Sequence, residues 1–176
     1  MVELEHKEKE KVKDIFFYHS SETPYGCFSN FFICDFIDDK TNIKYISSEQ
    51  YFMLKKSIKF EPENKELQEK ILKETNQGKI KQLGRQVKNY NPKVWDEKRF
   101  DVMLNAIILK FQQNENLKNI LIQTGNSNIY EASPTDNIWG IGFNQKDALK
   151  VNKNQYGLNL LGKALIEARK ILKIKK

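Results

Sequence analysis

The sequence has few cysteines, few histidines and no long apolar runs, and each shortage excludes a class of protein. Its two cysteines, Cys27 and Cys34, have no second pair with which to form a disulfide framework or a zinc site. Apolar runs such as residues 106–109 are far too short to cross a bilayer. The N-terminus lacks the apolar core of a signal peptide. We therefore expect free thiols, a cytoplasmic location and no membrane partner.

The formal net charge of +7 is concentrated at the C-terminal end of the chain. Residues 145–176 contain nine lysines and arginines against only Asp147 and Glu167, whereas residues 1–144 are balanced. A basic C-terminal helix can attract phosphates or nucleic acid. Aromatic residues do not interleave its lysines, as single-strand binders usually require, so a solvated lysine face is the alternative interpretation.

Local patterns predict an α+β protein made of one compact domain, with short N-terminal strands followed mostly by helices. Residues 1–13 alternate Glu and Lys and predict a charged, mobile leader, so the domain spans 14–176. Aromatic and β-branched runs predict strands at 15–18, 31–37, 43–46 and 128–130. Apolar periodicity predicts helices at 48–59, capped by Ser47, and at 62–73, 95–112 and 117–121. Leu158, Leu161, Leu165, Ala168 and Leu172 mark an amphipathic C-terminal helix.

The stretch EASPTDNIWGIGF, residues 131–143, combines unusual residue types without any helical or strand period. It holds two carboxylates, a tryptophan that can stack on a ligand, and two glycines that let backbone approach a ligand closely. The glycines are not a dinucleotide fingerprint, because the third glycine and the following helix are lacking. For Glu131 we favour a structural role in bracing the loop.

Two further stretches place polar residues where a pocket wall would need them. Glu49 lies in the first turn of its predicted helix, where it either complements the helix terminus or serves a site. Lys56 lies two turns further on roughly the same face, a spacing that is also typical of an exposed surface charge. Ser29 and Asn30 stand between phenylalanines, either as turn residues or as donors from an apolar wall.

These stretches belong to a longer series of motifs that occur in a fixed order. The series is GxFSNF from Gly26, SSExYFxxxK from Ser47, MxxAxxxKF from Met103, TG at Thr124, EASPxDxxWGxG from Glu131 and GxNxLG from Gly157. The series resembles the NADAR, or YbiA-like, family over residues 15–172. The resemblance implies a compact α+β fold and N-glycosidase chemistry on ribosylated bases, without a cofactor or a metal.

The resemblance also implies the substrate class. We expect removal of ADP-ribose from guanine in nucleic acid or nucleotides, with the basic C-terminal helix as a contact for nucleic acid. The alternatives are hydrolysis of phosphoribosylated pyrimidine intermediates of riboflavin synthesis and a non-catalytic ADP-ribose-binding module. Two carboxylates favour catalysis, because a pocket that only holds phosphates gains nothing from them.

Matching the motifs to the family predicts which positions of this sequence form the site. The catalytic positions are Glu49, Asp136 and Lys56, and the substrate-binding positions are Phe28, Ser29, Asn30, Ser48, Trp95, Ser133, Trp139, Gly140 and Gly142. Trp139 is expected to stack on a base, although a core position is the alternative. Gln50 and Gln155 depart from the family, which often has histidine and tryptophan at these positions.

The chemistry fits this assignment. Cleavage of a ribosyl C1′–N bond passes through a cation-like sugar, so one carboxylate can stabilise the transition state or activate water. A second acid is needed to protonate or hydrogen-bond the departing nitrogen. For His6 and His19 we expect structural or surface roles.

Overall fold

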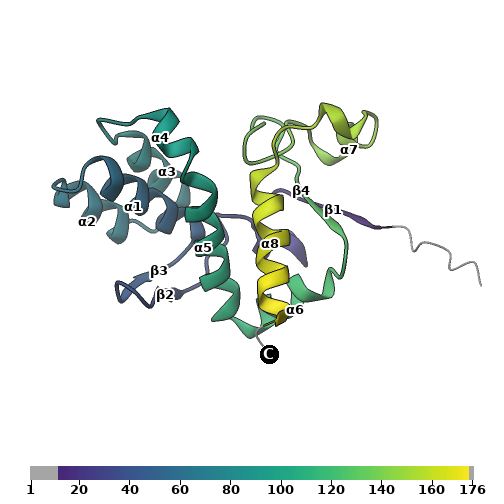
Figure 1. Cartoon of the computed structure of the whole chain (residues 1–176), viewed down its shortest axis with the longest axis horizontal. Helices are drawn as coiled ribbons and strands as arrows, with labels where there is room; N and C mark the ends of the chain where they lie inside the picture. Colours follow the sequence, from purple (N-terminus) through teal and green to yellow (C-terminus); the bar gives the residue numbers. More distant parts are fainter. Residues whose placement is uncertain (1–11, 175–176) are drawn as a thin grey trace, which may run out of the picture.

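The computed structural model describes residues 12–174, which form a compact α+β fold (Figure 1). Most of the predicted leader, residues 1–11, lies outside the described residues, and so does His6. Val12 and Lys13 have no regular structure and lead into the first strand. None of the helices within 12–174 combines the length and the apolar character needed to cross a membrane.

Four short strands form two separate two-stranded sheets. Strand β1 (Asp14–Phe17) pairs in parallel with β4 (Asn128–Glu131), and Ile15 lies opposite Ile129. Strand β2 (Phe36–Asp38) pairs antiparallel with β3 (Ile43–Tyr45). The strand predicted for 31–37 is therefore wrong over residues 31–35. There the amide of Phe31 donates to Ser29 Oγ at 3.2 Å, in a turn.

The helices supply most of the fold. They are α1 (Ser48–Phe60), α2 (Lys65–Lys73), α3 (Gln77–Arg85), α4 (Pro92–Asp96), α5 (Arg99–Gln112), α6 (Glu115–Gln123), α7 (Gln145–Ala148) and α8 (Leu160–Ile174). Two 3₁₀ turns, η1 (Tyr25–Phe28) and η2 (Lys153–Gln155), complete the set within the described chain. The predicted N-cap of α1 is confirmed, because Ser47 Oγ accepts from the amide of Gln50 at 3.0 Å.

Two helical predictions need correction, and two helices were missed. Helix α2 begins three residues after Pro62, because Asn64 caps it by accepting from the amide of Leu67. The predicted 95–112 helix is two helices, since the chain turns at Glu97 and Lys98 between α4 and α5. Helices α3 and α7 were not predicted.

The core lies where α5 packs against α1 on one side and against α8 on the other (Figure 1). The apolar face of α8 is buried, with Leu161, Leu165 and Leu172 at most 1% exposed. Leu158 precedes this helix and is 49% exposed, so it is not part of the stripe. Helix α3 packs on α1, and β4 packs on α8. This arrangement brings the start of α1, the face of α3 and the end of β4 to one cavity.

Candidate active site

The main cavity has a volume of about 690 Å³, within the range that small-molecule sites occupy. It is lined by residues from six separate segments of the chain. They are Tyr18, His19, Ser20 and Ser21; Ser29, Asn30 and Phe31; Glu49, Phe52 and Met53; Lys81 and Arg85; Met103; and Glu131, Ser133, Thr135, Asp136 and Trp139.

Glu49 is placed by the first turn of α1. Its amide donates to the carbonyl of Asn30 at 3.2 Å, which ties the helix start to the cavity wall. The side chain is only 4% exposed, and its Oε1 is buried without a hydrogen-bond partner among residues 12–174. Buried carboxyl oxygens are normally satisfied, so this oxygen is explained most simply by a bound ligand or water.

The charge state of Glu49 is set by opposing effects. Burial raises the pKa of Glu49 to about 7, while the positive charges of Lys81 and Arg85 act to lower it. Asp136 raises this pKa further, and Lys56 makes the smallest contribution in the opposite direction. The carboxyl group can therefore change its protonation state near neutral pH, as acid–base catalysis requires.

Lys81 and Arg85 lie four residues apart on α3 and both line the cavity. Neither forms an ion pair with a residue in the described range, and the Lys81 amino group lies 5.8 Å from the centre of the Phe31 ring. Two cations without acidic partners on one wall form a surface that suits phosphate.

The position of α3 depends on close contact with α1. A Cβ atom on Gly84 would lie 1.9 Å from the sulfur of Met53, so a larger residue here would force the Met53 side chain to move. Lys56 Nζ donates to the carbonyl of Gly84 at 3.0 Å and lies 4.3 Å from the centre of the Tyr90 ring. Lys56 is not among the cavity-lining residues; its amino group instead holds the turn that carries Arg85.

The loop after β4 is held by its own hydrogen bonds. Asp136 Oδ1 accepts from the amides of Ile138 and Trp139 at 2.9 and 2.8 Å. A Cβ atom on Gly140 would lie 2.9 Å from the carbonyl oxygens of both Glu131 and Asp136. The close backbone approach predicted at Gly140 is therefore made within the loop itself.

Gly142 adopts φ of +75°, in the left-handed region that favours glycine. It does not line the main cavity and borders a separate hollow beside Tyr156 and Leu158. Its glycine is required by the backbone conformation of the loop.

Glu131 ends β4 and faces the same cavity as Glu49. Its Oε2 is buried and has no hydrogen-bond partner in the part of the chain that the structure describes. Burial raises the pKa of Glu131 to about 7, and the charge of Asp136 adds to this effect. The structural role expected for the residue does not account for the unpartnered oxygen.

Ser29 and Asn30 form another part of the cavity wall. Lys110, 1% exposed, donates from Nζ to the carbonyl of Ser29 at 3.1 Å. Asn30 Oδ1 is buried and has no hydrogen-bond partner within 12–174. The side chain of Asn30 is therefore available to a ligand.

Aromatic rings form part of the cavity wall and of the layer behind it. Trp139 meets Phe52 edge-on, with ring centroids 5.2 Å apart, and Phe52 in turn lies 5.0 Å from Trp95. Trp95 is 4% exposed and does not line the cavity, so it acts from behind Phe52. Phe28 is a core residue, and Ser48 is buried beside Glu49 with an unpartnered Oγ.

Of the positions predicted for the site, half line the cavity: Ser29, Asn30, Glu49, Ser133, Asp136 and Trp139. Phe28, Ser48, Lys56, Trp95, Gly140 and Gly142 do not. Lys81 and Arg85 were missed, although their four-residue spacing would have flagged them once α3 was recognised. His19 also lines the cavity. No group of three or more His, Cys, Asp or Glu residues in 12–174 is arranged to hold a metal ion.

The comparisons with known proteins identify the family of the chain. The NADAR domain family matches residues 16–173, nearly the whole chain. The protein therefore belongs to the NADAR family, several members of which are named N-glycosidases.

Three relatives illustrate the range of sequence identity and coverage. N-glycosidase R617 of Acanthamoeba polyphaga mimivirus is 39% identical over 91% of this chain and 96% of its own. N-glycosidase YbiA of Escherichia coli is 29% identical over 90% of this chain and 89% of its own. Its NMR structure matches with a TM-score of 0.74 at 28% identity, over 93% of this chain and 86% of the other. Riboflavin biosynthesis protein VVA0006 of Vibrio vulnificus is 29% identical over 90% of this chain but only 38% of its own length.

Proposed function

We propose that this protein is an N-glycosidase that removes ADP-ribose from guanine in nucleotides or nucleic acid. The observation that carries the proposal is the meeting of Glu49 with Lys81 and Arg85 in one cavity. A buried carboxylate offsets the positive charge that develops on the sugar, and two cations without acidic partners suit a substrate with two phosphate groups.

The residues that line the cavity then have distinct roles in binding and catalysis. Lys81 and Arg85 hold the diphosphate, and the face of Trp139 offers a stacking surface for a base. Glu49 stabilises the cation-like sugar and accepts a proton from the attacking water. The C1′–N bond breaks with its electron pair going to the base.

A second candidate substrate is a phosphoribosylated pyrimidine intermediate of riboflavin synthesis. It is favoured by the relative from Vibrio vulnificus, which is named a riboflavin biosynthesis protein. Such a substrate carries one phosphate and would need only one of the two cations of α3. A module that only binds ADP-ribose is disfavoured, because burying two carboxyl groups beside phosphate adds a cost without a benefit.

The test is product analysis by mass spectrometry after incubation with each substrate. We expect ADP-ribose and the unmodified guanine nucleotide from the ADP-ribosylated guanine nucleotide, and slower release of the base from the phosphoribosylated aminopyrimidine. Glu49→Gln is the matched control, because it preserves shape and removes the charge; we expect a loss of at least ~10²-fold in kcat. The absence of any product from the wild-type protein, or wild-type rates in Glu49→Gln, would contradict the proposal.

A further inference from the structure

We infer that Glu131 is a second catalytic residue, the acid that donates a proton to the departing base nitrogen. The inference rests on the proposed function, and it adds a residue that neither the motif comparison nor the relatives' names assign. Glu131 and Asp136 both line the cavity, but the surroundings of their carboxylates differ.

The first difference is what each carboxylate contacts. Asp136 Oδ1 accepts two backbone hydrogen bonds and thereby forms a turn of its own loop. Glu131 Oε2 is buried at the cavity wall without any partner among residues 12–174. A protonated carboxyl group needs an acceptor in reach, and a nitrogen of a bound base would supply it.

The second observation is that the backbone of Glu131 is held on both sides. Its amide donates to Asn159 Oδ1 at 3.1 Å, and its carbonyl accepts from the amide of Ile141 at 2.9 Å. Asn159 Nδ2 also donates to the carbonyl of Ile129 at 2.9 Å, so one side-chain amide bridges two residues of β4. Asn159 has φ of +51°, an uncommon conformation for a residue other than glycine. Such fixed placement is what a proton donor requires.

The third observation is the difference between the charged groups around Glu49 and those around Glu131. Burial is the main cause of the raised pKa of both groups. Beyond burial, Glu49 has Lys81, Arg85 and Lys56 acting to lower its pKa, whereas Glu131 has only Lys81 acting in that direction. Both groups therefore titrate near pH 7, and the larger number of nearby positive charges favours the ionised form of Glu49.

The other titratable groups at the cavity do not reverse this order. The acidic neighbours Asp136 and Glu49 both act to raise the pKa of Glu131. The titratable and charged residues that line the cavity from every element are Tyr18, His19, Glu49, Lys81, Arg85, Glu131 and Asp136. Cations lie on the α3 wall, so they favour an ionised Glu49 and leave the proton on Glu131.

The step then balances. Water attacks C1′ while Glu49 accepts one of its protons, the C1′–N bond breaks, and Glu131 gives its proton to the nitrogen that receives the electron pair. The products are the ribose hydroxyl and the neutral base. Transfer of a proton from Glu49 to Glu131 through solvent restores the starting state.

The first experiment needs no substrate. Protein labelled with ¹³C at glutamate carboxyls is titrated by NMR, and signals are assigned from Glu131→Gln and Glu49→Gln. We expect the carboxyl signal lost in Glu131→Gln to be mostly protonated at pH 6, because the pKa of this group is raised to about 7. An ionised Glu131 at that pH would overturn the inference whether or not the glycosidase activity is found.

The second experiment measures pH–rate profiles with the ADP-ribosylated guanine nucleotide. Glu131→Gln should lower kcat by ~10²- to 10⁴-fold and abolish the fall in rate on the alkaline side. The control is Glu97→Gln, the same substitution at an exposed glutamate that does not line the cavity, and we expect it to keep wild-type activity. Asp136→Asn tests the competing assignment of the acid to Asp136. A larger loss in Asp136→Asn than in Glu131→Gln would transfer the role to Asp136. An active wild type with an unaffected Glu131→Gln would overturn this inference alone.

Discussion

Lys110 and Ser29 are joined by a buried hydrogen bond of 3.1 Å between an amino group and a carbonyl oxygen 81 residues apart in sequence. The next carbonyl, that of Asn30, accepts from the amide of Glu49 at 3.2 Å. Lys110 on α5 therefore holds the segment against which the first turn of α1 rests. Its amino group otherwise faces the rings of Phe32 and Phe111, at 5.3 and 5.4 Å.

Burial of this amino group predicts a specific pH dependence of stability. Burial lowers the pKa of Lys110 to about 8, from 10.5. Between these two pH values the unfolded chain binds the extra proton, so the free energy of unfolding contributed by Lys110 rises with pH. The full change is about 3 kcal/mol at most, at ~1.4 kcal/mol for each pKa unit.

The measurement compares urea unfolding of the wild type and Lys110→Met from pH 7 to pH 10. Burial also raises the pKa of Cys27 to about 11, which makes both proteins lose stability at high pH. The difference between them reports the loss of Lys110, including its effect on the Cys27 thiol, and we expect it to shift in favour of the wild type as the pH rises. A difference that does not change with pH would mean that the lysine stays charged in the folded protein.

The cations of α3 predict two coupled effects on activity. Lys81→Met should raise KM roughly 10- to 100-fold, the cost of one charge-assisted hydrogen bond to phosphate. It should also move the acidic limb of the pH–rate profile to higher pH, because loss of a nearby positive charge raises the pKa of Glu49 above about 7. Lys79→Met is the control, since Lys79 is exposed on the same helix and does not line the cavity. Equal effects in the two variants would exclude a phosphate contact at Lys81.

These cations also show where sequence analysis fails. Helix α3 contains Gly78 and Gly84 and only Ile80 and Leu83 as apolar residues, so neither propensity nor periodicity predicts it. Its stability comes from packing on α1, which only the three-dimensional structure shows. In contrast, the start of α1 was predictable, because a serine cap followed by Glu49 is a local signal.

The loop shows the same division between local and long-range information. Its residue types, a proline, a tryptophan and two glycines, predicted a functional loop. They did not distinguish Asp136 from Glu131, because the burial of Glu131 and the turn bonds of Asp136 depend on the folded chain. Motif order located the site, and the environment of each carboxylate had to come from the structure.

Lys56 was predicted as a third catalytic residue, and its geometry leads to a distinct test. Its Nζ donates to the carbonyl of Gly84, one residue before Arg85, so we expect it to position that cation. Lys56→Arg should retain activity, whereas Lys56→Met should raise KM by about as much as Arg85→Met. Borohydride added during turnover should leave no sugar adduct on Lys56. An adduct at this residue would instead establish the nucleophilic role.

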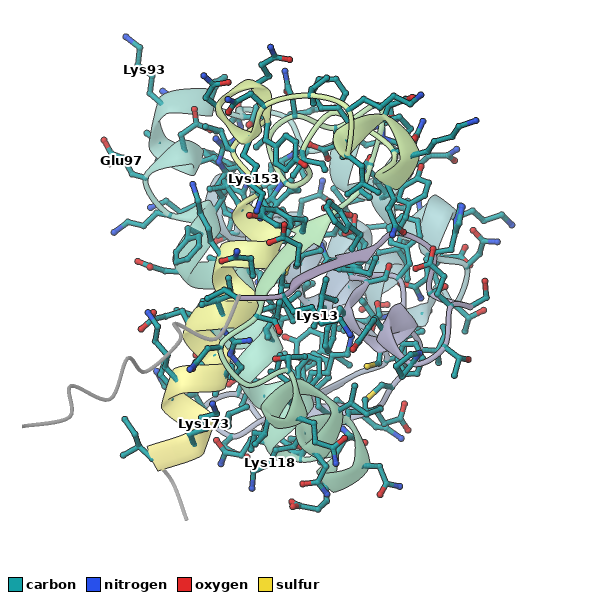
Figure 2. All side chains as sticks on the ribbon, turned by 90° about the vertical axis from the view of Figure 1, so that its right-hand side faces the viewer. Lys13, Lys93, Glu97, Lys118, Lys153 and Lys173 are labelled. Carbon is teal, nitrogen blue, oxygen red and sulfur yellow. The ribbon has the colours of Figure 1, made fainter. Side chains whose placement is uncertain are left out.

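The exposed lysines of α8 predict how the enzyme would respond to a nucleic-acid substrate. Lys163, Lys170 and Lys173 lie on the outer side of the helix, and Lys173 is at the same end of the molecule as Lys118 (Figure 2). Arg169 is excluded from this set, because it is buried and donates to Thr124 Oγ1 at 2.7 Å. The basic region therefore offers fewer contacts than its composition indicates.

If flanking phosphates of a nucleic acid bind these three lysines, apparent affinity should fall with salt by a log–log slope of about −0.7 for each contact. Replacing Lys163, Lys170 and Lys173 by glutamine should then flatten the slope by up to about 2, with turnover of a free ADP-ribosylated guanine nucleotide unchanged. The control replaces Lys70, Lys73 and Lys79, which removes equal charge from exposed positions on α2 and α3. Because a charge effect without specific contacts would be the same in both triple variants, equal slopes would show that α8 does not bind the nucleic acid. The favoured substrate would then be the free nucleotide.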